Sequence, residues 1–488
     1  MLKKRRSKVA LISLISLIVV LLVGAFTWLH FNSTRQLPLG SRQKVEHLPR
    51  VKIKGALSQT VDTNPTVRFS FKDKQTGVEE KGYATMKWQG QSSRRYPQKN
   101  WKVTFYKDKS RKHKLKWRAN PGWKKHSSYV IKANYIDATQ SRNIVNSQLW
   151  GDMVATRAGA PKQLTHSQNG GAINGFPIEM KVNGDRWGLY TLNTPKDAKL
   201  WGLDKHDPTN IAISSNQWNK ADLFWSDKVH YNEDGWTSDI PKELTTQQKQ
   251  DFERLVHFVN TSDTKTFKAH ASEYLDVNSV IDMYLFTNLI HDQDGLGRNL
   301  ELLTYNGQIW HATMYDLDST WGLYENGRHI YPSGESVSHN YPNQGDLKTA
   351  EGNRLLQQVV QAYPNRVQAR WRQLRKTTLT PNKVNREFTS FMTTVGDPNY
   401  QNNFQRNPGI PSKKLTSLMQ LRSSIDRQFK ECDALFDNYT SNVKRLHFNY
   451  VAPTLTESER ESSRAKASSA KAQSENSRND DSSAVSPK

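Results

Sequence analysis

The chain has 488 residues, of which 35% are hydrophobic and 10% aromatic, and this composition excludes a largely disordered protein. A net charge of +24 favours anionic surroundings. However, no helix-turn-helix, zinc-finger or RNA-binding signature accompanies the charge, so nucleic acid is not an expected partner. The single cysteine, Cys432, excludes an internal disulfide framework.

The N-terminus joins a basic cluster to a long apolar run. Residues 1–8 read MLKKRRSK, and residues 9–31 read VALISLISLIVVLLVGAFTWLHF, which is long enough to span a bilayer as a helix. The positive-inside rule keeps the basic end in the cytoplasm and exports the chain beyond the apolar run. A cleaved signal peptide is the alternative, but the run is too long and no small-residue cleavage pattern comes after it. We expect a single-pass membrane protein with most of its chain outside the cell.

Polar segments flank a central folded region. Residues 32–47 are polar without periodicity and are expected to be a linker. Residues 454–488 contain no aromatic residue, so they cannot bury enough apolar surface to fold and are expected to form a disordered tail. Between them, residues 48–445 are expected to form the functional domain.

The first part of this domain, to about residue 215, predicts strands. Short runs alternate apolar and polar residues between Gly, Pro and Asn-Gly punctuation. These runs are TVRFSFKD, YATMKWQG, NWKVTFYK, SSYVIKANY, FPIEMKVNG and RWGLYTLN. Asn183-Gly184 predicts a hairpin turn between the last two runs. One helix is expected to interrupt the strands, at about residues 141–154.

From about residue 245 onward, apolar residues recur at helical spacing. The one strand-like interruption is a hairpin at residues 300–322. A strand-rich N-lobe succeeded by a helical C-lobe with an embedded hairpin gives a two-lobed α+β fold. A ligand is then expected in a cleft between the lobes.

The hairpin of the C-lobe lies between two groups of acidic and amide residues. Asp294 and Asn299 precede it in D-G-L-G-R-N, and Asp316 and Asp318 end it in Y-D-L-D. Phosphoryl transfer needs an acid that orients the nucleophile, an Asn near the metal and a second acid on Mg²⁺. Asp, Gly and Asn are also common in turns, and D-x-D alone also fits a nucleotide-sugar glycosyltransferase. The combination of apolar helix, D-x-x-x-x-N, hairpin and paired acids favours phosphoryl transfer.

Two polar turns of the N-lobe carry further candidates. In the first, the backbone of residues 90–93 together with nearby Arg and Lys side chains can face phosphates. In the second, K-A-N-Y-I-D-A-T-Q-S-R-N, Arg142 falls in the first turn of the expected helix. From its own context, Arg142 is expected to pair with a carboxylate or to hold the turn.

Five motifs of the chain together resemble the CotH kinase family, which is named for spore coat protein H. In order, they are G-Q-S-S-R-R-Y-P-Q-K-N-W-K (90–102), A-N-Y-I-D-A-T-Q-S-R-N (133–143), V-N-G-D-R-W-G-L-Y (182–190), D-G-L-G-R-N (294–299) and Y-D-L-D-S-T-W-G (315–322). The resemblance covers roughly residues 80–325, and the helical remainder to about residue 440 fits less specifically.

The resemblance implies an atypical protein-kinase-like fold that phosphorylates proteins with ATP and Mg²⁺ or Mn²⁺. By position, Asp294 is similar to the family's catalytic Asp, and Asn299 to its loop Asn near the metal. Asp316 is similar to the metal-binding Asp, with Asp318 in support.

The resemblance also implies a set of residues that contact the nucleotide. This set is Lys99, Arg142, Gly90, Ser92 and Ser93. Lys102 and Lys132 compete with Lys99 for contact with the phosphates. The chain departs from the family after G-x-Y, where Thr194 and Pro195 stand in the place of the usual acidic residue, so its hinge contacts with the nucleotide are not assigned.

Three functions are compatible with these features, and a membrane-anchored extracellular kinase acting on surface or secreted proteins is the leading hypothesis. The second is a catalytically idle adhesion or envelope-assembly protein, because the +24 charge suits anionic envelope polymers. The third is a metal-dependent glycosyltransferase that uses Asp316 and Asp318. This last hypothesis needs parallel strands upstream, which the hairpin-rich N-lobe does not favour.

Overall fold

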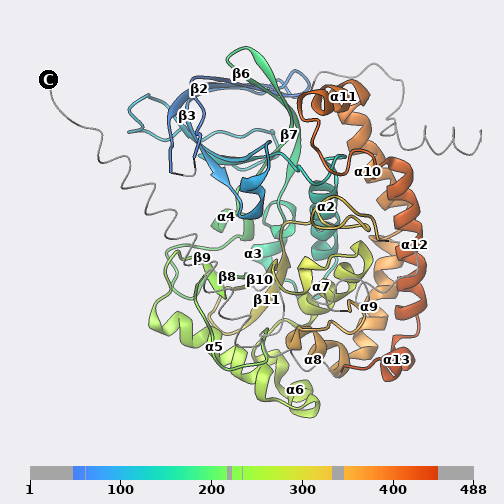
Figure 1. Ribbon diagram of the computed structural model, residues 1–488. Helices are drawn as coiled ribbons and strands as arrows, with labels where there is room; N and C mark the ends of the chain where they lie inside the picture. The colour runs from blue at the N-terminus through green and yellow to red at the C-terminus, as the bar shows by residue number, and fades with distance from the viewer. Residues whose placement is uncertain (1–47, 61, 217–222, 233–234, 332–345, 449–488) are drawn as a thin grey trace, which may run out of the picture. The chain divides into compact units, whose positions relative to one another are not determined.

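The computed structural model describes residues 48–448, apart from residue 61 and the segments 217–222, 233–234 and 332–345 (Figure 1). The expected membrane anchor at 9–31, the linker at 32–47 and the tail at 454–488 lie outside the described residues. Among the helices of the described part, none has the length and apolar character needed to cross a membrane.

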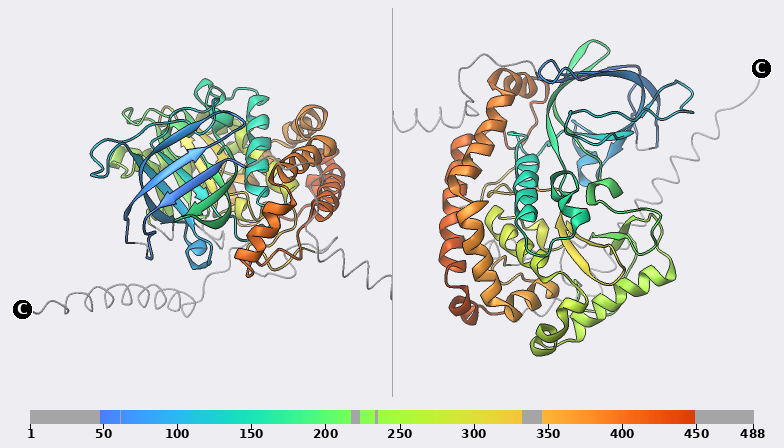
Figure 2. Two further views of the ribbon diagram at one scale, coloured as in Figure 1. Left: turned by 90° about the horizontal axis from the view of Figure 1, so that it is seen from above. Right: turned by 180° about the vertical axis from the view of Figure 1, so that it is seen from behind.

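The first half of the described chain forms a closed barrel of seven strands. Its strands are β1 (Arg50–Lys54), β2 (Thr66–Lys72), β3 (Glu79–Gln89), β4 (Asn100–Tyr106), β5 (Ser128–Lys132), β6 (Gly175–Val182) and β7 (Asp185–Asn193). They neighbour one another in the order β1-β2-β3-β4-β5-β7-β6. Neighbours are antiparallel except for β1 and β6, whose parallel pairing closes the barrel (Figure 2).

The alternating sequence of these strands explains the barrel. In β2, for example, Val67, Phe69 and Phe71 are buried, whereas Arg68 and Lys72 between and after them are exposed. Because side chains of a strand alternate between its two faces, one face fills the interior and the other meets water. At the predicted β6–β7 turn, Asn183 and Gly184 have φ angles of +52° and +99°. The hairpin prediction is confirmed, and Asn-Gly tolerates this backbone.

A long helix leaves the barrel after β5 and runs into the second half of the molecule. Helix α2 (Arg142–Ala155) agrees with the helix predicted at 141–154 and is buried over most of its length. It contacts the central helix α7 (Val277–Ile290) and α10 (Pro381–Val395). A helix that begins at the barrel and ends among other helices places its first turn beside residues of both halves.

A second sheet supports the predicted C-lobe hairpin. The sheet is antiparallel, with the order β11-β10-β8-β9. Its strands are β8 (Ile211–Ser215), β9 (Trp236–Ile240), β10 (Leu300–Thr304) and β11 (Trp310–Met314). The hairpin β10–β11 lies within the predicted hairpin at residues 300–322, but its partner strands β8 and β9 were not predicted from the sequence. Every residue of β10 and β11 is buried, and β8 satisfies the backbone of β10 that a lone hairpin would leave unpaired.

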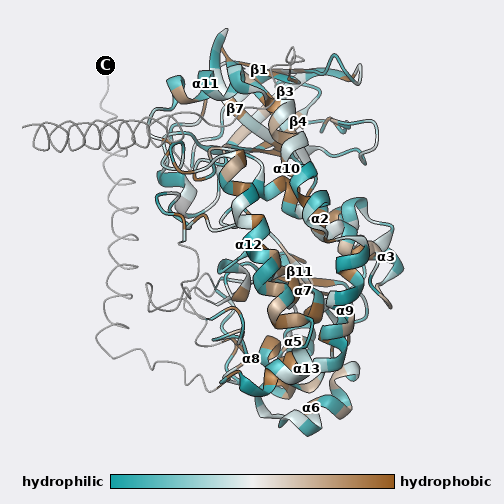
Figure 3. Cartoon of the chain, turned by 90° about the vertical axis from the view of Figure 1, so that its right-hand side faces the viewer, coloured by the Kyte–Doolittle hydropathy of each residue, from teal (hydrophilic) through white to brown (hydrophobic). Residues whose placement is uncertain are grey.

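The region beyond residue 245 is helical, as predicted. In addition to α7 and α10, its helices are α5 (Thr246–Thr261), α6 (Thr264–His270), α8 (Arg354–Ala362), α9 (Pro364–Thr377), α11 (Asp397–Arg406), α12 (Leu418–Phe436) and α13 (Tyr439–Asn442). Two short helices, α3 (Lys162–Thr165) and α4 (Ala198–Trp201), come before the second sheet in sequence. Helix α7 contacts α2, α8, α9, α12 and β11. Its apolar sequence therefore forms the centre of the core (Figure 3).

Candidate functional site

One large cavity, of about 770 Å³, collects residues from both halves of the described chain. Its volume lies in the range of pockets that hold small-molecule ligands. The four residues predicted to surround the reacting phosphate all line it, namely Asp294, Asn299, Asp316 and Asp318. The structure therefore brings the two ends of the hairpin to one place, and the catalytic and metal-binding roles of these side chains stay predictions.

The loop that carries Asp294 comes directly after the buried helix α7. The helix ends at His291, whose φ of +58° turns the chain, and Asp294 then begins a short 3-10 helix, η4 (Asp294–Leu296). The carbonyl of Asp294 accepts hydrogen bonds from the backbone N–H groups of Gly297 and Asn299, at 3.0 and 3.2 Å. These bonds fold the loop back on itself, so the two polar side chains of D-x-x-x-x-N face the same cavity.

Helix α2 holds the acidic segment after β11. Asn143 donates to Asp316 Oδ1 at 3.4 Å and accepts from the N–H of Leu317 at 3.3 Å. Asn146 donates to the carbonyl of Leu317 at 3.1 Å and accepts from Trp321 Nε1 at 2.8 Å. These two amides were not predicted from the sequence. The available signal was their spacing, since residues three apart lie on one face of a helix.

Lys132, at the end of β5, neutralises both acids of Y-D-L-D. Its Nζ contacts Asp316 Oδ1 and lies 3.2 Å from Asp318 Oδ2. Burial lowers the pKa of Lys132, but the two carboxylates outweigh burial and raise the pKa above its ordinary value, so the ammonium stays charged. Burial raises the pKa of Asp318 to about 7, although Lys132 acts in the opposite direction.

The structure distinguishes the three lysines that competed for the phosphates. Lys102 and Lys132 line the cavity, and Lys99 does not. The Nζ of Lys99 donates to the carbonyl of Arg94 at 2.7 Å and lies 4.5 Å from the ring centre of Trp88. The ammonium of Lys99 closes its own turn, so the geometry favours Lys132 or Lys102 over Lys99, and contact of any of the three with phosphate stays a prediction.

The turn between β3 and β4 reaches the cavity through its backbone. Gly90 and Ser93 line the cavity, and Ser92 begins the 3-10 helix η1 (Ser92–Arg95). Gly90 has a φ of +101°, and a Cβ built on it would lie 2.0 Å from Ser93 Oγ, so the turn requires glycine here. Gln91 Oε1 accepts a 2.7 Å hydrogen bond from Arg298, which ties this turn to the Asp294 loop.

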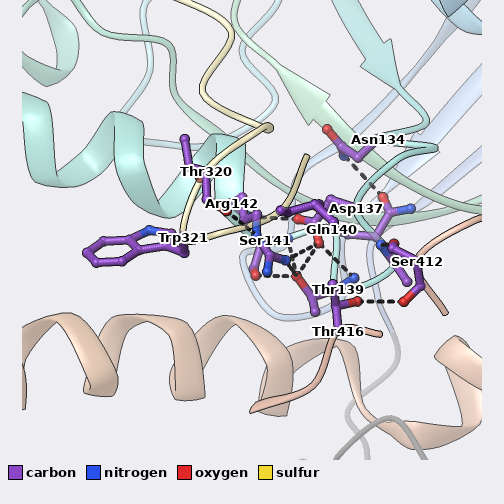
Figure 4. Close-up of polar contacts among 12 residues, drawn as sticks. Asn134, Asp137, Thr139, Gln140, Ser141, Arg142, Thr320, Trp321, Ser412 and Thr416 are labelled. Atoms are coloured by element: carbon purple, nitrogen blue, oxygen red, sulfur yellow. Dashed lines mark hydrogen bonds and ion pairs between the residues drawn. The ribbon is translucent and has the colours of Figure 1, made fainter. Parts of the chain in front are cut away.

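Arg142 does not line the cavity, contrary to its expected place among the nucleotide contacts. The side chain is fully buried, with Nη1 2.6 Å from Asp137 Oδ1. Its Nε donates to the carbonyl of Thr320 at 2.9 Å (Figure 4). Its Nη2 donates to Gln420 Oε1 at 2.8 Å. Because each nitrogen of the guanidinium already has a partner, Arg142 joins three chain segments, as its own sequence context indicated.

The acidic end of the cavity offers the ligands that a hard divalent cation prefers. In the described part of the chain, no group of three or more His, Cys, Asp or Glu side chains is arranged to hold a metal. Mg²⁺ is commonly bound through one or two carboxylates, with substrate phosphates and water as the other ligands. Asp316 and Asp318 supply two carboxylates on the cavity wall, with Asn299 beside them, so the donor set fits such a cation.

Comparison with known families identifies the family of this chain. The sequence model of the family described as CotH kinase protein matches residues 86–431. The chain belongs to the CotH kinase family. The match begins in β3 and ends in α12, so it covers most of the barrel together with the helical region. This CotH family member is thus an atypical kinase-like protein. No curated protein matches the chain.

The cavity of this CotH protein also contains a second ion cluster, which was not predicted from the sequence. Lys196 lies in the segment after β7 where the sequence departs from the family pattern. Its Nζ contacts Glu301 and lies 2.8 Å from Asp239 Oδ2 and 2.7 Å from Ser214 Oγ. Burial raises the pKa of Glu301 to about 7, even though Lys196 lowers it. The ring centre of Tyr315 is 4.8 Å from Lys196 Nζ.

Proposed function

We propose that this CotH family member is a protein kinase that transfers the γ-phosphate of ATP to protein hydroxyl groups with the help of Mg²⁺ or Mn²⁺. The observation that carries the proposal is the convergence of Asp294, Asn299, Asp316, Asp318 and Lys132 on one cavity of about 770 Å³. Phosphoryl transfer requires a positioned nucleophile and electrostatic stabilisation of the phosphoryl oxygens, and these five side chains supply both.

In the proposed mechanism, Asp294 accepts the hydrogen bond of the acceptor hydroxyl and takes its proton as the hydroxyl oxygen bonds to the γ-phosphorus, while the bond from the γ-phosphorus to the bridging oxygen of the β-phosphate breaks and ADP leaves. Asp316 and Asp318 are the carboxylates that would hold the divalent cation, with Asn299 beside them. When bound, the cation supplies positive charge next to the phosphate oxygens. The Gly90 turn would present backbone N–H groups to the phosphates, and a side chain at Gly90 would clash with Ser93 and disturb this turn.

Lys132 has two partners in this mechanism. Without nucleotide, its ammonium is the cation that balances Asp316 and Asp318. In the complex, those carboxylates would bind the metal, and the ammonium of Lys132 would turn to a phosphate oxygen. A Lys side chain is suited to such an exchange, because it is a point charge on a flexible stem.

The setting of the reaction is part of the same proposal. We place the enzyme in the cell membrane through residues 9–31, with the catalytic domain outside and surface or secreted proteins as acceptors. The run of basic residues before the anchor and the apolar run itself support this orientation.

A basic arm of the barrel favours a second candidate function, attachment to anionic envelope polymers. We define the basic arm as residues 107–125, which connect β4 to β5. It carries one acid, Asp108, and nine exposed cations: Lys107, Lys109, Arg111, Lys112, Lys114, Lys116, Arg118, Lys124 and Lys125. The apolar residues Trp117 and Trp123 fix it to the barrel core. Binding that weakens steeply with salt, and equally in an Asp294→Ala variant, would support this function.

The glycosyltransferase alternative has less support. It expects a nucleotide-binding half with a parallel sheet before the D-x-D motif. The strands before Asp316 instead form a barrel in which β1 and β6 are the one parallel pair, and a sheet whose described strands are all antiparallel. Turnover of a UDP-sugar would favour this alternative over the kinase.

The decisive experiment is incubation of the purified protein with γ-labelled ATP, Mn²⁺ and envelope proteins as acceptors. We expect labelled protein with the wild type and none with Asp294→Ala or Asp316→Ala. Asp152→Ala is the matched control, because Asp152 also pairs with a lysine but lies outside the cavity. Labelling that persists in the two cavity variants, or is absent from the wild type, would contradict the kinase proposal.

A further inference from the structure

The second ion cluster of the cavity, formed by Lys196, Asp239 and Glu301, differs from a solvated surface group because it connects separate chain segments and is largely shielded from solvent. Lys196 joins three separate chain segments: its own, after β7; β9, through Asp239; and β10, through Glu301. The side chain of Glu301 is 5% exposed and that of Lys196 19%, so these two charges are held inside the protein. The cluster is thereby fixed in position before any ligand binds.

Asp239 is the member of this cluster that offers an acceptor to the cavity. One carboxylate oxygen, Oδ2, contacts Lys196 and accepts the hydroxyl hydrogen of Ser214. Among the described residues, no hydrogen bond or ion pair is found for the other oxygen, Oδ1. The side chain is 20% exposed and lines the cavity, so Oδ1 can accept a hydrogen bond from a ligand.

The charges of the cavity decide which part of a nucleotide reaches Asp239. A carboxylate repels phosphate, whereas the metal-binding acids, Lys132 and the Gly90 turn line the same cavity and provide a place for phosphates. A nucleotide whose phosphates lie there must place its nucleoside in the remaining space. The hydrogen-bond donors of a nucleoside are its ribose hydroxyls and the exocyclic amine of its base, and a fixed carboxylate is an acceptor for either.

We propose that Asp239, held by Lys196 and Ser214, accepts a hydrogen bond from the nucleoside of ATP, either from a ribose hydroxyl or from the adenine amine. This inference rests on the proposed kinase function and deepens it, because it assigns nucleoside recognition to a carboxylate of β9 that is held by Lys196, a residue of the segment where the chain departs from the family pattern. Lys196 and Glu301 are positioning residues, since they act on the nucleoside through Asp239.

The inference can be tested by calorimetric titration of the wild type and Asp239→Asn with three ligands in the presence of Mn²⁺. The ligands are ATP, 2′,3′-dideoxy-ATP and purine riboside triphosphate, which lacks the exocyclic amine. We expect Asp239→Asn to bind ATP about 10-fold more weakly, the effect typical of a hydrogen bond to a charged group. Asp152→Asn makes the same chemical change outside the cavity and should bind ATP like the wild type.

The pattern across ligands identifies the donor. If the donor is a ribose hydroxyl, the wild type and Asp239→Asn bind dideoxy-ATP equally, and if it is the amine, they bind purine riboside triphosphate equally. An equal loss for all three ligands, or no loss with ATP, would overturn the inference and leave the kinase proposal intact. Failure of the wild type to bind ATP would overturn both. Equal melting temperatures of the two proteins would show that the variant is folded.

Discussion

The buried ion pairs of this protein fall into two kinds, according to whether they lie in the scaffold or in the cavity. In the scaffold, Arg142 pairs with Asp137 and Arg157 with Asp282, and all four side chains are at most 1% exposed. In the cavity the cation is a lysine, and each lysine has a carboxylate partner that retains exposure: Asp316 beside Lys132 is 39% exposed, and Asp239 beside Lys196 is 20% exposed.

The difference follows from the chemistry of the two cations. A guanidinium has several donors in a rigid plane, so it can bind a carboxylate and a backbone carbonyl at once, as Arg142 does with Asp137 and Thr320. An ammonium is a compact charge that leaves parts of its carboxylate partners to other ligands. In this protein, arginine pairs therefore connect chain segments permanently, whereas lysine pairs keep acidic groups neutralised and available to a ligand.

Replacing Arg142 by Met tests the scaffold side of the comparison and should have the largest effect. Asp137 would remain buried without its cation, and loss of one partner from a buried pair costs about 3–5 kcal/mol. Urea denaturation should show this decrease in the free energy of unfolding. Arg386→Met, at an exposed position on α10, is the control. A stability equal to that of the control would show that Arg142 is not a scaffold residue.

Replacing Lys132 by Met tests the cavity side. We expect phosphotransfer to fall about 10²- to 10³-fold, as when one electrostatic group of an active site is removed. Stability should fall less than in the Arg142 variant, because Asp316 remains partly solvated. Mn²⁺ should also raise the melting temperature of the variant more than that of the wild type, because the competing ammonium is gone. A loss of stability as large as that of Arg142→Met would break the comparison.

Within the described part of the chain, His291 is a partly buried base for which no carboxylate partner is found. Burial lowers its pKa from 6.5 to about 4, and nearby Arg427 and Lys348 act in the same direction. Between these values the unfolded chain binds a proton that the folded chain does not, so stability is complete above pH 6.5 and falls as the pH approaches 4. The free energy of unfolding is therefore about 2 kcal/mol lower at pH 5 than at neutral pH.

The His291→Asn variant removes this titration, and asparagine tolerates the positive φ of the position. Urea denaturation at pH 7 and pH 5 should show a smaller loss of stability for the variant than for the wild type. Equal losses in the two proteins would mean that His291 is not the group that titrates.

Gly90→Ala is expected to have the smallest effect, about 1–2 kcal/mol on stability, with weaker binding of ATP. Its cost combines a φ of +101° with the clash against Ser93. Gly77→Ala is a matched control, because Gly77 has a φ of +72° but nothing within 4 Å of the added Cβ. Only the Gly90 variant should lose affinity in a titration with ATP. Equal ATP affinity in the two variants would show that the turn does not contact the nucleotide.

Local patterns were sufficient to predict much of the fold and the acidic part of the site. Strand alternation predicted six of the barrel strands, and Asn183-Gly184 predicted their last hairpin. The D-x-x-x-x-N and D-x-D motifs are separated by one hairpin of known geometry, so sequence alone could predict that they meet. Each of these inferences depends on residues close together in the chain.

Features that depend on distant residues could not be predicted in this way. Lys132 is 184 residues from Asp316, and nothing near Lys132 distinguishes it from Lys99 or Lys102. The pairing of β8 with β10 likewise joins segments on either side of α5, α6 and α7. The local context of Arg142 indicated the pairing with a carboxylate that the structure contains, whereas its nucleotide contact, which the resemblance implied, stays a prediction for a side chain that does not line the cavity.

Asn143 and Asn146 hold the segment after β11 by hydrogen bonds, and these bonds limit how the protein can be divided into fragments. A fragment beginning near residue 245 would keep Asp294, Asn299 and the Y-D-L-D acids, yet it would lack the two amides that hold the acids and the lysine that neutralises them. The C-terminal half alone therefore does not contain all the residues that build the acidic end of the cavity. Any partial domain, whether made by proteolysis or by design, must retain α2 together with the barrel strand that precedes it.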